Sequence, residues 1–143
     1  MAEVHLSEFL GELAKRKFDW AQSNCFLICA DWVLLVTGRD PASPWRGRYK
    51  TKHEAFRLIR EQGGPVALAT KAMERVKFIL TEVPSAGDVA LVWTPVGKRN
   101  NKIMERPTGA ICVGPNHYAV LTVDLGLVIA PLRLIKAWRV GGC

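Results

Sequence analysis

The sequence has no long apolar run and no amino-terminal targeting signal. Every apolar stretch is too short for a transmembrane helix. The first residues, 1–5, have neither the basic segment nor the apolar segment of a secretory signal. We therefore expect a protein without a membrane span, made and folded in a host cytoplasm unless another system exports it.

Cysteine is also scarce. The chain has four cysteines, which are too few for a disulfide scaffold: Cys25, Cys29, Cys112 and Cys143. In a reducing compartment such residues are free thiols, metal ligands or catalytic groups. The cysteines therefore exclude a small disulfide-rich class and leave three roles open.

No internal repeat and no low-complexity segment is present. With 143 residues, 49% of them hydrophobic and 23% charged, the chain fits one folded domain over residues 1–143. The net charge of +7 indicates an acidic or phosphate-rich neighbour. By charge alone, nucleic acid, an anionic cell envelope and an acidic protein all remain open.

Helical periodicity dominates the first half of the chain. Ser23 or Asn24 is a suitable N-cap for a helix that is apolar nearly all round, which is typical of a buried central helix. Thr51 and Glu54 form the pattern of a capping box for a later helix. Four helices are expected: residues 7–17, one from Asn24-Cys25 to Thr37-Gly38, one from Thr51 to Gly63-Gly64, and residues 66–76.

After Pro84 the pattern changes to short segments rich in β-branched residues and bounded by turn residues. The expected strands are residues 89–93, 109–114, 118–123, 127–130 and 137–140, with residues 95–107 as a long exposed loop. Helices followed by strands predict an α+β fold with N-terminal helices, a central Cys25-bearing helix and a C-terminal antiparallel sheet.

Cys25 is the strongest chemical candidate. At the first turn of a helix, free backbone N–H groups and the helix dipole favour a thiolate. A thiolate is the nucleophile of a cysteine hydrolase. The alternative is a buried structural cysteine, because free cysteine is among the most buried residue types.

Three features together resemble the NlpC-type branch of the papain-like fold. They are Trp20, then Asn24-Cys25 at the start of an apolar helix, then the turn Pro84-Ser85-Ala86-Gly87-Asp88-Val89 before the strands. In that branch an Asp/Asn-Cys pair starts the central helix and a Pro-x-x-Gly-Asp turn leads into the sheet. A histidine begins the following strand in a His-Val-Gly-Ile pattern.

The whole chain also resembles a family of phages and prophages found near tail genes. The shared segments are Thr37-Gly38-Arg39-Asp40-Pro41, the turn Arg46-Gly47-Arg48-Tyr49, the pair Gly63-Gly64 and the closing Ala137-Trp138-Arg139-Val140. This resemblance places the protein in a virion tail, with hub and tip proteins of the tail as partners.

The histidine of the NlpC pattern has two possible positions. Aligning residues 109–114 with the histidine-bearing strand puts Thr108 at the histidine position, and threonine cannot take a proton from a thiol near neutral pH. Aligning His117-Tyr118-Ala119-Val120 instead retains the histidine. For His117 the alternative is a polar turn residue in a hairpin.

The resemblance implies a cysteine hydrolase that cuts the peptide stem of bacterial cell wall as a phage tail enters its host. Cys25 is then the nucleophile and an oxyanion donor through its N–H, and His117 is the general base. Trp20, Asn24 and Tyr49 are the implied substrate-binding residues. The alternative hypothesis is a structural or assembly protein of the tail tip that keeps the fold without activity.

Zinc binding and nucleic-acid binding are two further functions that parts of the sequence could support. Cys25 and Cys29, one helical turn apart, could bind zinc with Cys112 or His117, but metal-ligand pairs come more often from Cys-x-x-Cys turns, so we expect no metal and no cofactor. A basic loop at residues 39–52, with Trp45 and Tyr49, could bind nucleic acid. The alternative, which we favour, is a loop packed by its aromatics with solvated charges. No nucleic-acid motif accompanies it, so nucleic acid is not an expected partner.

Overall fold

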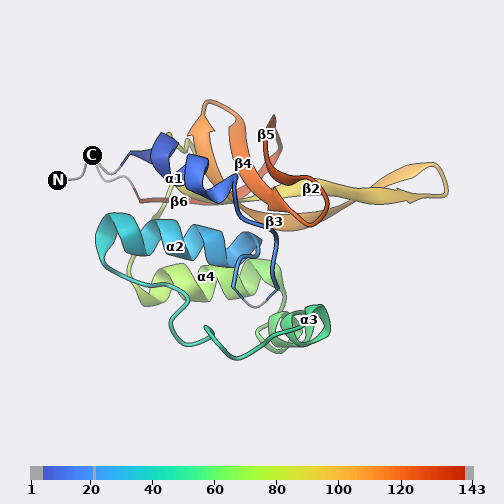
Figure 1. Ribbon diagram of the computed structural model, residues 1–143, viewed down its shortest axis with the longest axis horizontal. Helices are drawn as coiled ribbons and strands as arrows, with labels where there is room; N and C mark the ends of the chain where they lie inside the picture. The colour runs from blue at the N-terminus through green and yellow to red at the C-terminus, as the bar shows by residue number, and fades with distance from the viewer. Residues whose placement is uncertain (1–4, 21, 141–143) are drawn as a thin grey trace.

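The computed structural model describes residues 5–20 and 22–140. In this part of the chain, helices lie beside a six-stranded antiparallel sheet, which confirms the α+β class (Figure 1). The helices are α1 (Leu6–Leu13), α2 (Cys25–Thr37), α3 (Lys52–Glu61) and α4 (Pro65–Arg75). The strands are β1 (Ile79–Leu80), β2 (Val89–Arg99), β3 (Lys102–Gly114), β4 (His117–Thr122), β5 (Gly126–Pro131) and β6 (Leu134–Arg139). No helix in these ranges is long and apolar enough to cross a membrane.

Helix α2 is the buried central helix that its sequence predicts. Asn24 caps its start by accepting hydrogen bonds from the N–H groups of Phe26 and Leu27. Gly38 ends it in the left-handed conformation, at φ 77°. The helix packs chiefly on β3, and its buried residues are Leu27, Ile28, Ala30, Trp32 and Val33.

The sheet order is β1-β6-β2-β3-β4-β5. Strand β5 is at one edge of the sheet, and β6 pairs with β2 on the side away from β3. Only Leu132 and Arg133 connect β5 to β6. Such a short connection requires the sheet to curl strongly. The curl encloses a second core on the face away from α2, formed by Ala90, Val92, Ala110, Cys112, Tyr118, Val120 and Ala137.

Alternate residues of each central strand therefore enter different cores. In β2 and β3, Val89, Leu91 and Ile111 pack with Trp32 and Val33 of α2. Their neighbours in the strands belong to the enclosed core. Both faces of the central strands are consequently buried, and a side chain's position in the alternation decides which core it joins.

The prediction of a loop at residues 95–107 is wrong. These residues continue β2 and β3 as a hairpin that projects well beyond the rest of the domain (Figure 1). The hairpin turns at Asn100 and Asn101, with φ of 53° and 63°, and Arg99 pairs with Lys102 across the turn. Positive φ at both central residues is the type I′ geometry that suits strand twist, and asparagine tolerates it. The exposure expected for this segment is confirmed.

Smaller differences concern element ends. The first helix stops at Leu13 rather than at residue 17. The two-residue strand β1 was not expected, and it pairs with β6 at the edge of the sheet. The capping box of α3 is present as predicted, with Thr51 accepting from the Glu54 N–H and Glu54 accepting from the Thr51 N–H.

Candidate functional site

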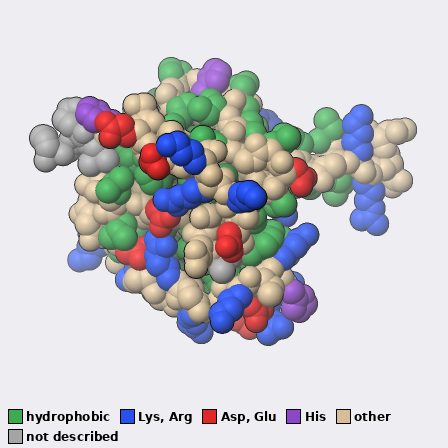
Figure 2. Space-filling view, viewed as in Figure 1, with side chains coloured by type: hydrophobic (Ala, Val, Ile, Leu, Met, Phe, Trp, Pro, Cys, Tyr) green, Lys and Arg blue, Asp and Glu red, His purple; other side chains and the backbone are tan. Residues whose placement is uncertain are grey.

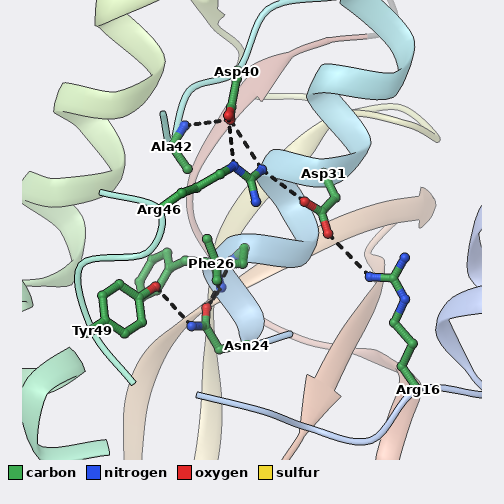
Figure 3. A network of polar contacts seen from close by, with 9 residues as sticks. Arg16, Asn24, Phe26, Asp31, Asp40, Ala42, Arg46 and Tyr49 are labelled. Carbon is green, nitrogen blue, oxygen red and sulfur yellow. Dashed lines mark hydrogen bonds and ion pairs between the residues drawn. The ribbon is translucent and has the colours of Figure 1, made fainter. Parts of the chain in front are cut away.

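The side chain of Asn24 joins three segments at the start of α2 (Figure 3). Its Oδ1 accepts from the N–H groups of Phe26 and Leu27, both at 3.0 Å. Its Nδ2 donates to the Trp20 carbonyl oxygen at 3.0 Å and to the Tyr49 hydroxyl at 3.1 Å. The structure thus brings together the three residues predicted to bind substrate. Asn24 and Tyr49 are buried, however, and these hydrogen bonds occupy their polar atoms.

Cys25 follows as the first residue of α2, as predicted. Burial raises the pKa of its thiol above the ordinary value. Backbone hydrogen bonds from Gly109 and from the first N–H groups of the helix, together with the charge of Arg106, act in the opposite direction without cancelling the burial effect. Cys25 is therefore a neutral thiol near neutral pH, although its place at the helix terminus favours a thiolate.

Gly109 of β3 occupies the position that faces Cys25. A Cβ built on Gly109 would lie 2.6 Å from the Cys25 carbonyl oxygen and 3.4 Å from the Cys29 sulfur. No side chain fits there without displacement of the helix backbone. Thr108, the residue aligned with the family histidine, belongs to the opposite face of the strand, and its hydroxyl lies 2.5 Å from the hydroxyl of Thr94.

The structure does not bring His117 to Cys25. His117 begins β4, is exposed, and has its Nδ1 at 2.9 Å from the Pro115 carbonyl oxygen. It pairs with Gly114, which lies roughly 16 Å along β3 from Gly109 at about 3.3 Å per residue. A general base must come within hydrogen-bond reach of its proton donor. The position of His117 corresponds instead to the alternative, a polar residue at a hairpin turn.

The other histidines do not fill this role. His5 and His53 are both exposed, His5 just before α1 and His53 in the first turn of α3. No histidine borders the cavity that Cys25 lines. Because His117 is remote, no histidine among the described residues lies where it could deprotonate the Cys25 thiol.

Of the three thiols proposed as zinc ligands, Cys25 and Cys29 are neighbours on α2, but Cys112 lies apart from them. Cys29 donates to the Ala110 carbonyl oxygen at 3.4 Å, and burial raises its pKa well above the ordinary value. Cys112 belongs to the enclosed core on the other face of the sheet. Within residues 5–20 and 22–140, no three His, Cys, Asp or Glu side chains are grouped so that they could hold a metal ion.

The basic loop at residues 39–52 is tied to α2. The Arg46 guanidinium binds Asp40 at 2.8 Å and Asp31 of α2 at 2.9 Å, and Arg16 binds the other oxygen of Asp31 at 3.3 Å (Figure 3). Tyr49 packs with Leu27 of α2, and Trp45 joins the same apolar cluster. This geometry matches the packed-loop alternative, with the correction that its central arginine is paired with carboxylates rather than solvated.

Asp88 of the Gly-Asp turn has a structural position. It is 2% exposed and accepts hydrogen bonds from the N–H groups of Ser85 and Val140, both at 2.9 Å. Its carboxylate therefore fixes the turn before β2 to the end of β6. The motif that supports the NlpC resemblance stabilises the sheet in this chain.

A cavity beside Cys25 is bordered by Trp20 and Lys52, which the sequence analysis covered, and by Phe56 and Arg106, which it did not single out. The rings of Trp20 and Phe56 lie 5.3 Å apart, edge to face. The cations of Lys52 and Arg106 each lie 5.7 Å from the centre of the Phe56 ring. A glycine within a strand, as at Gly109, was the available signal of a close backbone approach. Nothing in the sequence indicated that Arg106 would border this cavity.

Comparison with known proteins gives one result. A family model, Domain of unknown function (DUF6950), matches residues 2–140, so the chain belongs to this family. No curated protein and no solved structure matches the chain.

Proposed function

Starting from the chain's membership of the DUF6950 family, we propose that it is a non-catalytic protein of papain-like, NlpC-type fold that acts as a structural or assembly component of a phage tail tip. The order of elements supports the fold: a helix that begins at a cysteine, a Gly-Asp turn and a curled antiparallel sheet. The segments shared with phage tail-associated proteins support the setting.

The contact between Gly109 and Cys25 carries the proposal of inactivity. Strand β3 reaches the helix terminus with a glycine, and even one carbon there would approach the Cys25 carbonyl oxygen to 2.6 Å. The chain has only three histidines, and none of them borders the Cys25 cavity. A cysteine hydrolase needs a base beside its nucleophile, or another means of keeping it ionised.

The protonation of Cys25 points the same way. A raised pKa leaves the sulfur as a thiol at neutral pH, and the thiol is a poor nucleophile. One observation favours the rival hydrolase: Cys25 has the N–H groups of a helix terminus and Arg106 close by. Under that rival the substrate is the stem peptide of the bacterial cell wall and Cys25 attacks it.

Chemical reactivity and product analysis separate the two functions. The folded protein is treated with iodoacetamide at neutral pH, with urea-unfolded protein as control, and alkylated sites are located by mass spectrometry. We expect Cys25 to react only after unfolding, and purified peptidoglycan stem peptides to remain intact. Rapid alkylation of folded protein at Cys25, or stem-peptide cleavage that Cys25→Ser abolishes, would establish the hydrolase instead.

The structural role is tested in a phage that encodes this chain. Deleting the gene should stop the formation of infective particles with complete tails, whereas Cys25→Ser should yield wild-type numbers, because the sulfur performs no reaction. Complete tails in the deletion mutant would exclude an assembly role. Complete but non-infective particles with Cys25→Ser would show that the thiol is needed at entry.

A further inference from the structure

The extended β2–β3 hairpin, residues 95–106, is named the arm here. All of its side chains are exposed, and beyond its base, where Glu105 and Arg106 contact Arg133 and Phe56, the hairpin projects away from the rest of the domain (Figure 1). From Pro95 to the turn at Asn100 it spans roughly 16 Å, at about 3.3 Å per residue. An isolated two-stranded hairpin is marginally stable in water, so such an element is suited to packing against something outside the domain.

The end of the arm is strongly basic. Lys98, Arg99 and Lys102 surround the Asn100-Asn101 turn, and none of them forms an ion pair within the part of the chain that the structure describes. The arm's single carboxylate, Glu105, lies near its base and is paired with Arg133. The tip therefore presents an uncompensated positive charge.

Behind the tip, the arm exposes aliphatic side chains. Val96 is 51% exposed, Ile103 62% and Met104 43%. Figure 2 shows hydrophobic side chains along the projecting part and Lys and Arg side chains standing out toward its end. Single exposed aliphatic residues are ordinary on a protein surface. Ile103 and Met104 are adjacent in β3 and therefore project from opposite faces of the arm, so both faces carry exposed aliphatic area.

We propose that the arm docks into a groove of a partner protein that is acidic at its inner end and apolar along its walls. The cations at the tip would pair with the carboxylates, and Val96, Ile103 and Met104 would pack on the walls. This interaction does not depend on whether Cys25 is catalytic, and it adds a binding element that the proposed tail-tip role does not by itself require.

Charge and geometry disfavour other occupants. A second copy of the chain carries the same net charge of +7 and would be repelled. If the arm entered a lipid bilayer tip first, its charged turn would be buried before its aliphatic residues. Burying these charges in the membrane is costly. Nucleic acid would satisfy the cations through its phosphates, but it would leave the apolar side chains without a comparable surface.

Binding to defined probes tests the proposal. A fluorescent random copolymer of glutamate and tyrosine is titrated with the full-length protein, and binding is followed by the fluorescence anisotropy of the copolymer. Labelled polyglutamate is titrated in the same way for comparison. Polyglutamate, a short DNA duplex and vesicles of equal phosphatidylcholine and phosphatidylglycerol serve as competing surfaces. We expect the copolymer to bind most tightly, because it offers both carboxylates and apolar area.

Three arm variants and one control assign the binding. Replacing residues 96–104 with Asn-Gly shortens the arm to a two-residue turn after Pro95. The charge variant is Lys98→Gln/Arg99→Gln/Lys102→Gln, and the apolar variant is Val96→Thr/Ile103→Thr/Met104→Gln. The matched control, Arg57→Gln/Arg60→Gln/Lys71→Gln, removes the same charge from α3 and α4.

The three arm variants should each bind the copolymer about tenfold more weakly than wild type, and the control should bind within about twofold of it. Circular dichroism and melting curves like wild type's should show that each variant is folded, since every altered arm side chain is exposed. Equal losses in the control and the charge variant would overturn the proposal. Tighter arm-dependent binding to DNA or to the vesicles would also overturn it, in favour of those surfaces.

Discussion

Gly109 lies against the backbone of Cys25, and a Cβ on this glycine would come within 2.6 Å of the Cys25 carbonyl oxygen. The contact fixes the first turn of α2 on strand β3. Residue 109 itself has no side chain that could act on the Cys25 sulfur. The same glycine therefore permits close packing at the helix terminus and supplies no base there.

Gly109→Ala should destabilise the protein by about 1–3 kcal/mol, the usual cost of overpacking a tight contact. Backbone atoms lie nearest to the added carbon, so the strain cannot be relieved by a side-chain rotation. Urea denaturation measures the free energy of unfolding. Gly114→Ala is the matched control, because a Cβ there meets nothing within 4 Å and should change stability little.

Asn24→Ala should cost about 2 kcal/mol or more, because it removes the helix cap and also leaves the Tyr49 hydroxyl and the Trp20 carbonyl without this donor. Tyr49→Phe removes one of these bonds and should cost about 1 kcal/mol. Tyr49→Ala should lower the melting temperature further, since the ring packs on α2.

Asn24→Asp separates the two roles of Asn24. Aspartate keeps an acceptor for the N–H groups of Phe26 and Leu27 but sets an oxygen against the Trp20 carbonyl. We expect its stability, in the same urea series, to lie below that of wild type. Because an aspartate can still accept from the Tyr49 hydroxyl and is favoured by the helix dipole, a stability equal to wild type would mean that losing the bond to the Trp20 carbonyl costs no more than the added charge contributes.

The sequence predicts those parts of the molecule that local chemistry decides. Asn24 before an apolar run, Gly38 after it and the Thr51/Glu54 pair each fix an end of a helix through contacts within a few residues. The strands after Pro84 follow from their β-branched residues. None of these features depends on where the rest of the chain lies.

The site depends on distant contacts, and there the sequence was insufficient. Whether Thr108 or Gly109 faces Cys25 follows from strand alternation and register, which residue order alone did not fix. The spacing that made His117 a candidate base carries no information on its separation from α2. For the arm, Pro95 and Pro107 favour a loop, whereas the turn at Asn100-Asn101 makes a hairpin only because the flanking strands pair with each other.

Asp88→Ala should be among the most destabilising substitutions, at about 2–4 kcal/mol. It leaves the N–H groups of Ser85 and of the buried Val140 without their carboxylate acceptor and detaches the turn before β2 from the end of β6. Asp88→Asn retains one acceptor oxygen and should cost less. Asp124→Ala, at an exposed turn, is the control, and thermal melting measures all three.

The protein should lose stability as the pH rises above about 8.5, the pKa of an unperturbed cysteine. Burial raises the pKa of both Cys25 and Cys29, so the unfolded chain releases these protons at a lower pH than the folded protein does. The folded state then holds more protons than the unfolded state, and the free energy of unfolding falls with pH. This contribution is complete below the unfolded pKa and is lost as the pH rises through the folded pKa.

The Cys25→Ser/Cys29→Ser variant tests this cause, because serine does not ionise in the range concerned. Urea denaturation from about pH 7 to about pH 9.5 should show a shallower fall in stability for the variant than for wild type. Cys112, whose pKa is also raised by burial, remains in both proteins and accounts for the residual slope. Tyr49 and Tyr118 have raised pKa values too, but tyrosine ionises only near pH 10 and above. Identical slopes for the two proteins would mean that Cys25 and Cys29 titrate alike in the folded and unfolded states, and that the neutral Cys25 thiol of the non-catalytic proposal is wrong.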